Sequence, residues 1–466
     1  MHTDQIARLG SSFRDPAGFM FTHDGTLYRQ VNRAGSECYD KLMNSGLYGF
    51  LKKKGWIMPH EEVEAPVADP DLAHKILQPE PLSFVSYPYE WCFGQLKAAA
   101  IRTLQIQLAA LKHGMILKDA SAFNIQFHQG RAVLIDTLSF DPYSEGQIWE
   151  GYKQFCQHFL APLCLMASRD IRLGQLSRVH IDGIPLDLAS KLMPRSSWLR
   201  PGMLMHLHMH ARAQTAYAGS DPESSGKNKK SRSLSRKGLV GIVSGLRSLI
   251  RKLDWKPEGT EWGDYYQATN YTDDAFAAKS KHINAFLDEI KPRQLWDLGA
   301  NTGHFSRLGS NRGLETVAFD IDPAAVEINF RQVRQRKETS ILPLVMDLTN
   351  PSASIGWAGQ ERDSLTERGP VDCAMALALI HHLAISNNVS LDQIAQFFAG
   401  ISDHLIIEFV PKSDSQVKRL LNSREDIFAN YHEDGFEAAF QKKFDIRRRQ
   451  VVEGSHRTLY WLSRKA

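Results

Sequence analysis

A strand-like run followed by a turn with two glycines holds residue types that could do chemistry. The turn reads Asp297-Leu298-Gly299-Ala300-Asn301-Thr302-Gly303, a D-x-G-x-N-x-G pattern. Ligands of doubly wound sheets bind outside the carboxyl ends of the strands, and a turn that follows a strand lies there. Glycine lets the backbone approach a ligand, and asparagine tolerates left-handed torsion angles. This turn is therefore predicted to line a binding site.

The spacing of the turn favours a cationic ligand over a dinucleotide. A dinucleotide site uses G-x-G-x-x-G, so that a pyrophosphate meets the helix N-terminus. Here Asp297 stands before the glycines, and its charge would repel phosphate but attract a cationic amino-acid end. S-adenosylmethionine carries an ammonium and a sulfonium group and no phosphate, so it is the predicted cofactor.

Further acids end the next two predicted strands. Asp320 follows about 20 residues later, where a carboxylate can accept both ribose hydroxyl protons. Asp322 is the near alternative, although it can also cap the helix that starts at Pro323. Asp347 can accept a hydrogen bond from an adenine amino group. Acids at successive strand ends predict one shared site.

The elements that position these acids alternate strand and helix. The predicted strands span 294–298, 316–320, 342–346, 373–377 and 404–409. The predicted helices between them span 324–336 and 391–399. This alternation is typical of a parallel, doubly wound sheet. Two β-rich runs, 444–453 and 456–462, predict a closing antiparallel hairpin.

Residues 257–466 resemble the class I S-adenosylmethionine-dependent methyltransferases. DLGANTG is similar to their first motif, AFDID to their second, VMD to their third and DCAMALALIHHL to their fourth. The resemblance implies a Rossmann-like fold and these cofactor residues: Asp297, Gly299, Asn301 and Gly303 around the methionine and ribose, Asp320 on the ribose and Asp347 on the adenine. Asn301 departs from the glycine of many members.

Three residues are candidates for work on the methyl acceptor. His381 and His382 follow the fourth predicted strand, and a histidine can take a proton from an attacking hydroxyl or amine. Alternatively, one of them packs and the other shapes the loop. Glu408 ends the fifth strand and is a second candidate base or a substrate ligand. Transfer from a sulfonium needs mainly in-line positioning, so a reaction without an essential base stays open.

The N-terminal half contains a second pattern. Asp119 and Asn124 have the D-x-x-x-x-N spacing of a kinase catalytic loop, and Asp136 follows at the place of a second metal-binding aspartate. This half looks similar to the protein-kinase-like fold in its aminoglycoside-phosphotransferase branch, which implies a Mg-ATP site at these three residues. Asp-Phe-Gly is replaced by Asp-Thr-Leu, no phosphate loop precedes the Asp24-Gly25 turn, and Arg29 lies roughly where a lysine is expected. An ATP-dependent phosphotransferase or a pseudokinase is therefore an alternative function.

The composition and charge of the 466 residues indicate a folded protein with several distinct segments. A hydrophobic share of 43% and a charged share of 23% exclude global disorder, and a net charge of +4 does not by itself indicate nucleic acid. We predict an α+β domain over 1–218, a flexible basic linker over 219–237, an amphipathic helix over 238–256 and the methyltransferase domain over 257–466. The apolar stripe of the helix is expected to pack on the following domain, and an anionic membrane surface is the alternative.

Other features bear on partners and location. The N-terminus lacks an apolar signal region and no apolar run is long enough to span a bilayer, which predicts a cytoplasmic protein. His206, His208 and His210 spread around a predicted helix, and no cysteine pair has zinc spacing, so no metal site is predicted. Aromatic residues before the first strand could cover a cofactor: Trp262, Tyr265, Tyr266 and Tyr271.

Over its whole length the chain also resembles a bacterial family of two-part proteins connected with host-specific nodulation. Stretches such as Gly46-Leu47-Tyr48, Tyr89-Glu90-Trp91 and residues 135–140 (IDTLSF) carry this likeness. It implies methylation of a sugar or another secreted signal, so the predicted acceptor is a small molecule or a glycan. A nucleic-acid methyltransferase is a third reading, based on the basic linker and Arg447-Arg448-Arg449, but no N-P-P-Y or D-P-P-Y motif supports it.

Overall fold

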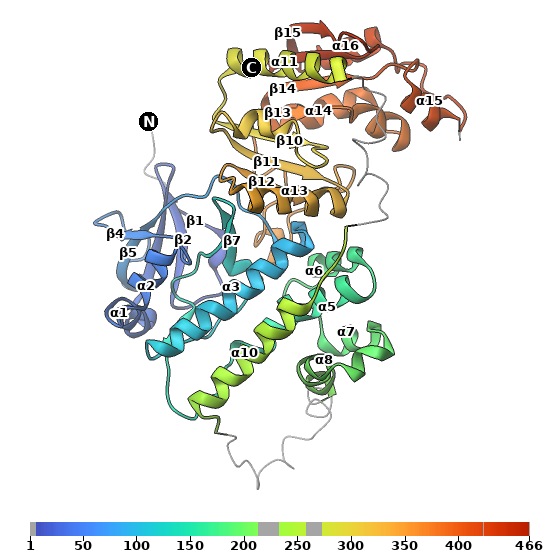
Figure 1. Cartoon of the computed structure of the whole chain (residues 1–466). Coiled ribbons are helices and arrows are strands. Elements are labelled where there is room, and N and C mark those ends of the chain that lie inside the picture. Colours follow the sequence, from blue (N-terminus) through green and yellow to red (C-terminus); the bar gives the residue numbers. More distant parts are fainter. Residues whose placement is uncertain (1–5, 213–232, 258–272, 423, 466) are drawn as a thin grey trace. The chain divides into compact units, whose positions relative to one another are not determined.

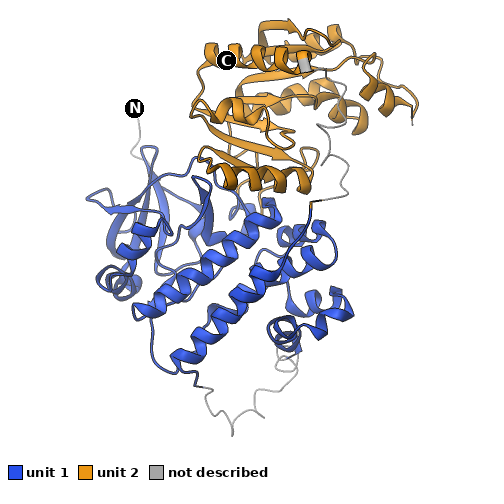
Figure 2. Ribbon diagram, in the orientation of Figure 1, with its two compact units in different colours: residues 1–256, 356–362 blue, residues 257–355, 363–466 orange. Residues whose placement is uncertain are grey.

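The computed structural model describes residues 6–212, 233–257, 273–422 and 424–465. The chain forms two compact units, coloured separately in Figure 2. Unit 1 contains residues 1–256 and 356–362, and unit 2 contains residues 257–355 and 363–466. A short segment from the second half of the sequence therefore belongs to unit 1.

Unit 2 is built on a seven-stranded sheet (Figure 1). Its strands, in spatial order, are β12 (Ile341–Val345), β11 (Glu315–Asp320), β10 (Gln294–Leu298), β13 (Val371–Ala376), β14 (Ser402–Phe409), β16 (Thr458–Arg464) and β15 (Phe444–Val451). The first five are parallel, and β16 and β15 close the edge as an antiparallel hairpin. The predicted mostly parallel sheet with its closing hairpin is confirmed.

Helices of unit 2 bury the apolar side chains of this sheet. They are α11 (Asp273–Ile290), α12 (Ser306–Ser310), α13 (Pro323–Arg336), α14 (Leu391–Ile401), α15 (Ser415–Leu421) and α16 (Glu433–Phe440). Ile283 and Leu287 of α11 join a core cluster with Met375 and Ile406 of the central strands. The period-2 alternation of the strands and the 3.6-residue period of the helices bring these apolar side chains together.

Unit 1 begins with an antiparallel five-stranded sheet. Its spatial order is β1 (Ala7–Arg8), β2 (Gly18–His23), β3 (Thr26–Asn32), β5 (Ala73–Pro79) and β4 (His60–Glu62). The predicted hairpin turn at Asp24-Gly25 joins β2 to β3, and both turn residues have positive φ angles, 48° and 73°. Two-residue hairpin loops favour this left-handed conformation because it matches the twist of the strands.

The rest of unit 1 is mostly helical, with two short strand pairs. The pairs are β6 (Met115–Leu117) with β9 (Phe140–Pro142) and β7 (Ile125–His128) with β8 (Arg131–Leu134). The helices are α1 (Ser36–Asn44), α2 (Leu47–Lys54), α3 (Phe93–Lys112), α4 (Gly151–Phe155), α5 (Ala161–Ser168), α6 (Leu176–Val179), α7 (Leu186–Leu192), α8 (Pro201–Met203) and α10 (Arg236–Lys252). The mixed α/β character predicted for this half is observed.

Helix α10 packs against α3 of unit 1, so the prediction that its stripe packs on the following domain is wrong. Its apolar side chains Leu239, Val243, Leu246 and Ile250 are buried. Just after the helix, the backbone carbonyl of Leu253 accepts a 2.5 Å hydrogen bond from Nζ of Lys97, which lies on α3. The apolar stripe identifies an amphipathic helix, but only the fold selects the surface that covers it.

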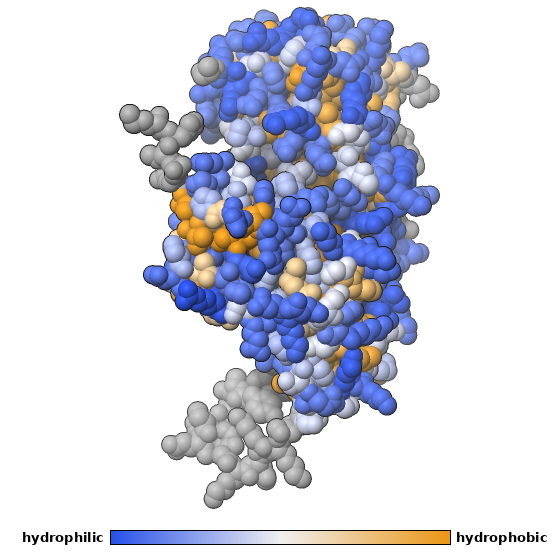
Figure 3. Space-filling view, turned by 90° about the vertical axis from the view of Figure 1, so that its left-hand side faces the viewer, coloured by the Kyte–Doolittle hydropathy of each residue, from blue (hydrophilic) through white to orange (hydrophobic). Residues whose placement is uncertain are grey.

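The face of the molecule drawn in Figure 3 is largely polar. On the face seen in Figure 3, hydrophilic side chains dominate and hydrophobic ones gather in a limited area. Among the described residues, we find no helix whose length and hydrophobicity would allow it to cross a lipid bilayer. Most of the predicted linker, and all four aromatic residues suggested as a cofactor cover, lie outside the described residues.

Candidate functional site

The glycine turn after β10 is tied to the neighbouring strand. Backbone N–H groups of Gly299 and Ala300 both donate to the carbonyl oxygen of Phe319, each at 2.9 Å. Gly299 and Gly303 have φ angles of 85° and 79°, in the left-handed region that favours glycine. A Cβ on Gly303 would lie 2.4 Å from the Asn329 side chain, so this position also leaves no space for a larger residue.

Asp320 at the end of β11 organises the middle of the turn. Its Oδ2 accepts a 2.7 Å hydrogen bond from the backbone N–H of Asn301, and its Oδ1 accepts one of 2.8 Å from Asp322. Asn301 has a φ of 49°, which fits the left-handed tolerance expected of asparagine. Asp322 accepts from the N–H of Ala324 at 2.8 Å and caps α13, so the capping interpretation of Asp322 is confirmed.

Asp297 and Asp320 are almost fully buried, and this burial dominates their electrostatics. Burial raises the pKa of Asp297 to about 7, although Ser306 donates a 2.5 Å hydrogen bond to its Oδ2. Burial likewise raises the pKa of Asp320 to about 6, against three backbone hydrogen bonds that lower it. Two buried carboxyl groups with raised pKa values at one sheet edge would ionise more readily beside a cation.

The third acid lies on the same edge of the sheet. Strands β10, β11 and β12 are neighbours and parallel, so their carboxyl ends are adjacent. Asp347 follows β12, and its Oδ1 accepts hydrogen bonds from the N–H and the hydroxyl of Thr349, at 2.8 and 2.6 Å. The fold therefore brings Asp297, Asp320 and Asp347 to the ends of three adjacent strands.

An apolar side chain was missed by the sequence reasoning at this edge. Ile321, directly after Asp320, is 54% exposed although it is a large aliphatic residue. Solvent exposure of one such residue is ordinary, but here it lies between two aspartates at a strand end. The flat apolar face of a purine ring could cover it. The aspartates on either side, at positions 320 and 322, were the available sequence signal.

His381 and His382 follow β13 at the start of a short helical segment, which includes a π-helix over His382–Ser386. Their ring centroids are 4.1 Å apart, and the Nδ1 atom of His381 is buried without a hydrogen-bond partner. Burial holds the pKa of His381 well below its usual range and lowers that of His382 to about 4. Both imidazoles are therefore neutral near pH 7, and the burial that lowers their pKa values makes them weak bases. Leu379, just before this helical segment, would lie 3.5 Å from a Cβ on Gly299.

Glu408 is at the end of β14 and is fully buried. Its Oε2 accepts a 2.8 Å hydrogen bond from Nζ of Lys279 and a 2.7 Å hydrogen bond from the backbone N–H of Ala378. Nη1 of Arg457 lies 3.8 Å from the same oxygen. Glu408 is therefore an ion-paired carboxylate with several donors around it. Lys279 was also missed from the sequence, because it lies on a helix more than 120 residues away.

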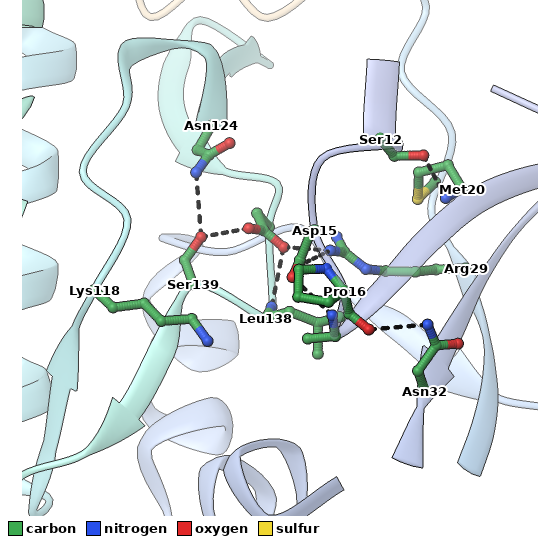
Figure 4. A network of polar contacts seen from close by, with 12 residues as sticks. Ser12, Asp15, Pro16, Met20, Arg29, Asn32, Lys118, Asn124, Leu138 and Ser139 are labelled. Atoms are coloured by element: carbon green, nitrogen blue, oxygen red, sulfur yellow. Dashed lines mark hydrogen bonds and ion pairs between the residues drawn. The ribbon is translucent and has the colours of Figure 1, made fainter. Parts of the chain in front are cut away.

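Unit 1 brings Asp136, Asn124 and Arg29 into one polar network, much of which is drawn in Figure 4. Nη2 of Arg29 is 2.7 Å from Oδ1 of Asp136 and 3.7 Å from Oδ2 of Asp15. The Ser139 hydroxyl donates to Oδ2 of Asp136 and accepts a 3.2 Å hydrogen bond from Nδ2 of Asn124.

This network does not fit a magnesium site. Both oxygens of Asp136 are already bonded, to Arg29, to Ser139 and to the N–H of Leu138. Asp119 accepts from the N–H of Ser121 at 2.9 Å, and burial raises its pKa. The guanidinium of Arg29 supplies the positive charge that a divalent cation would bring. Within the described ranges, no group of three or more His, Cys, Asp or Glu side chains could hold a metal ion.

Two other sequence features have structural partners. His206 is 2.8 Å from the Tyr152 hydroxyl through Nδ1, and His208 lies between Ser190 and Ser197, 2.7 and 2.8 Å from their hydroxyls. These histidines therefore pack. The arginine run on β15 is matched by acids, since Arg448 pairs with Glu289 and Arg449 with Glu433, both at 2.8 Å. That pairing weakens the case for a nucleic-acid surface.

Comparison with known proteins gives one full-length relative. The chain is 35% identical over 469 residues to the nodulation protein NoeA of Rhizobium meliloti (strain 1021), covering 98% of this chain and 96% of the relative. A scan against protein-family models found no match.

Several solved structures show a weaker likeness. The magnesium protoporphyrin IX methyltransferase ChlM of Synechocystis PCC 6803, with bound S-adenosylhomocysteine, is 16% identical, with a TM-score of 0.32, over 44% of this chain and 93% of ChlM. The bifunctional kinase-methyltransferase WbdD is 14% identical, with a TM-score of 0.30, over 46% of this chain and 45% of WbdD. Such low identities and TM-scores assign no function by themselves.

Proposed function

We propose that this chain, which belongs to the family of the nodulation protein NoeA, transfers a methyl group from S-adenosylmethionine to a small-molecule or glycan acceptor. One observation carries the proposal: two buried aspartates with raised pKa values and a third acid end three adjacent parallel strands, beside a glycine turn. Such a site attracts a cationic nucleoside rather than a dinucleotide.

Each residue of the edge has a proposed task. Asp297, Gly299, Asn301 and Gly303 would hold the methionine and ribose end, Asp320 would accept from the ribose hydroxyls, and Asp347 would accept from the adenine amino group. Ile321 offers an apolar surface to the purine. S-adenosylmethionine, when bound, supplies an electrophilic methyl group on its sulfonium.

On the acceptor side, residues of this chain orient the acceptor and take up the proton of its hydroxyl or amine. His382 is partly exposed and His381 is buried, so His382 is the better placed to receive a proton from an acceptor hydroxyl or amine. His381 supports its ring from one side. A methyl transfer from sulfonium gains most from in-line alignment, so the loss of His382 should slow the reaction without abolishing it.

Isothermal titration with S-adenosylhomocysteine tests the cofactor assignment. Wild-type protein should release heat, and Asp320→Ala should weaken binding by about tenfold or more, since it removes a charge-assisted hydrogen-bond acceptor. Asp372→Ala is the matched control, because Asp372 lies at the opposite end of β13 and bonds the N–H of Arg293 at 2.8 Å. An absence of heat with wild-type protein, or equal affinities for all three proteins, would refute the assignment.

The acceptor class can be tested with S-adenosylmethionine that carries a labelled methyl group. The purified protein is mixed with bacterial extract separated into small-molecule, glycan and nucleic-acid fractions. We expect label in one of the first two fractions. Label that is released only by nuclease would instead support the nucleic-acid methyltransferase, and label in no fraction would leave the acceptor proposal without support.

The second candidate is nucleotide binding by unit 1, favoured by the convergence of Asp119, Asn124 and Asp136. Since the Arg29–Asp136 pair does not fit a magnesium ion, we derive no phosphoryl-transfer step. A pseudokinase-like role predicts a thermal shift with ATP that does not depend on Mg²⁺. A shift that requires Mg²⁺ and disappears in Asp136→Asn would restore the phosphotransferase alternative.

A further inference from the structure

A buried ion pair in unit 2 has no part in the proposed cofactor contacts. Lys279 of α11 and Glu408 of β14 are 1% and 0% exposed, and Nζ of Lys279 lies 2.8 Å from Oε2 of Glu408. The ammonium also lies 4.7 Å from the ring centroid of Phe305. Burying two charges is unfavourable unless further hydrogen bonds satisfy them, and an apolar pair of similar volume would often be as stable. The pair therefore calls for a role other than stability.

The same oxygen of Glu408 bonds a strained turn. Oε2 accepts a 2.7 Å hydrogen bond from the backbone N–H of Ala378, two residues after β13 ends. Ala378 has a φ of 49°, in the left-handed region that an L-residue with a Cβ avoids. Such a conformation persists only where surrounding contacts enforce it. The carboxylate of Glu408 is the contact that holds this N–H.

The backbone conformation at Ala378 determines which side chains lie over the glycine turn that follows β10. Leu379 follows Ala378, and its Cδ1 would be 3.5 Å from a Cβ on Gly299. His381 and His382 come next along the chain, where a short helical segment begins. If the turn at Ala378 relaxed to an ordinary backbone conformation, Leu379 and both histidines would be displaced from this position. The ion pair thus controls one wall of the proposed site.

We propose that Glu408, held by Lys279, is a positioning residue that fixes residues 377–383, the turn after β13 and the start of the following helical segment, over the glycine turn, rather than a base that takes a proton. Its carboxylate is fully buried and surrounded by Lys279, Arg457 and the N–H of Ala378, which leaves it as an acceptor for this segment. The functional consequence rests on the proposed methyl transfer, whereas the fixing of the segment does not.

Two double variants separate the acceptor atom from the charge. Glu408→Gln with Lys279→Met keeps a carbonyl oxygen for the N–H of Ala378 and removes both charges. Glu408→Leu with Lys279→Met also removes both charges, but it leaves no acceptor. Because both replacements are uncharged and similar in volume, both proteins should fold, and thermal unfolding verifies this.

Hydrogen exchange of the backbone of residues 377–383 is the first readout. We expect exchange at least about tenfold faster in the Leu/Met protein and within about threefold of wild type in the Gln/Met protein, since one buried hydrogen bond is lost only in the former. Affinity for S-adenosylhomocysteine should follow the same order. Equal exchange in both variants, fast or slow, would overturn the proposal, because the acceptor atom would then make no difference.

A further variant tests the strain at Ala378 directly, so that the conclusion does not depend on whether one particular variant folds. Adding Ala378→Gly to the Leu/Met protein lets residue 378 adopt its left-handed conformation freely, and exchange should slow again by about fivefold. No slowing would contradict the claim that strain at Ala378 is what Glu408 opposes. If wild-type protein binds no S-adenosylhomocysteine but the exchange pattern holds, the proposed function fails while the positioning role stands. Binding that is lost in Asp320→Ala, together with unchanged exchange, refutes only the positioning role.

Discussion

At the scale of single residues, the buried aspartates make cofactor binding depend on pH. Burial raises the pKa of Asp297 to about 7 and that of Asp320 to about 6, so the ligand-free protein holds protons there below neutrality. A bound ammonium group favours the ionised carboxylates. We therefore expect affinity for S-adenosylhomocysteine to rise about tenfold between about pH 5.5 and about pH 7.5, measured by titration calorimetry.

Without ligand, the stability of the folded protein depends on pH in the opposite direction to the affinity. A carboxyl group whose pKa is raised by folding contributes stability at low pH, and this contribution disappears as the pH rises through about 6 to 7. The increase in Tm on adding S-adenosylhomocysteine should therefore grow with pH. Asp320→Asn should weaken the pH dependence of this Tm increase. A Tm increase that is the same at about pH 5.5 and about pH 7.5 would contradict the assignment of these two carboxyl groups to the site.

At the scale of elements, the glycine turn requires both its backbone conformation and its close packing. Gly303 and Gly313 have nearly equal φ angles, 79° and 80°, but only a Cβ on Gly303 would meet neighbouring atoms, those of Asn329. Gly313→Ala should lower the free energy of unfolding by about 1 kcal/mol and Gly303→Ala by about 3 kcal/mol. Urea unfolding measures both values, and equal losses would show that contact with Asn329 is unimportant.

Helix α10 offers a second test at this scale. Helix α10 packs against α3, and its Val243 is buried, whereas Val240 on the same helix is 37% exposed. Val243→Asp should destabilise the protein by about 3 kcal/mol, because an unpaired charge would be buried, and Val240→Asp should change stability by less than about 0.5 kcal/mol. Thermal or urea unfolding of the full chain distinguishes them. Similar small effects would mean that the apolar stripe is available to another surface, such as a membrane.

At the scale of the whole molecule, buried histidines make the fold sensitive to acid. Burial lowers the pKa of His60, His158 and His206 to about 4, so an unfolded chain takes up protons there that the folded chain refuses. Stability is therefore lost as the pH falls from about 6.5 toward 4, by roughly 1–2 kcal/mol for each group at about pH 5. The raised pKa values of Asp297 and Asp320 increase stability as the pH falls, but these two groups are fewer than the three histidines.

Thermal unfolding between about pH 7 and about pH 5 measures this loss. We expect Tm to fall over this range, and His158→Gln, which cannot titrate, to lose less than wild type. His128→Gln is the control, because the side chain of His128 is 25% exposed. A Tm that stays constant over the range would contradict the neutral, buried state of these histidines.

The sequence by itself determined the strands of unit 2 and the order of its strand-end acids, but not all of its helices: α12, α15 and α16 were not predicted. The predicted strand at 294–298 has the same bounds as β10, and the glycine turn after it has the expected left-handed residues. These features depend on local patterns, namely the alternation of side chains along a strand and the torsion angles that glycine and asparagine allow. Neighbouring parallel strands then bring the acids to one edge.

Only the tertiary structure decided which distant groups meet. Lys279 and Glu408 are 129 residues apart, and nothing local in either segment indicates the pair or its bond to Ala378. The same holds for Arg29, which neutralises Asp136, and for α10, which is covered by α3. A charge or an apolar stripe requires a partner once it is buried, but the identity of that partner is set by chain topology, which short-range patterns do not encode.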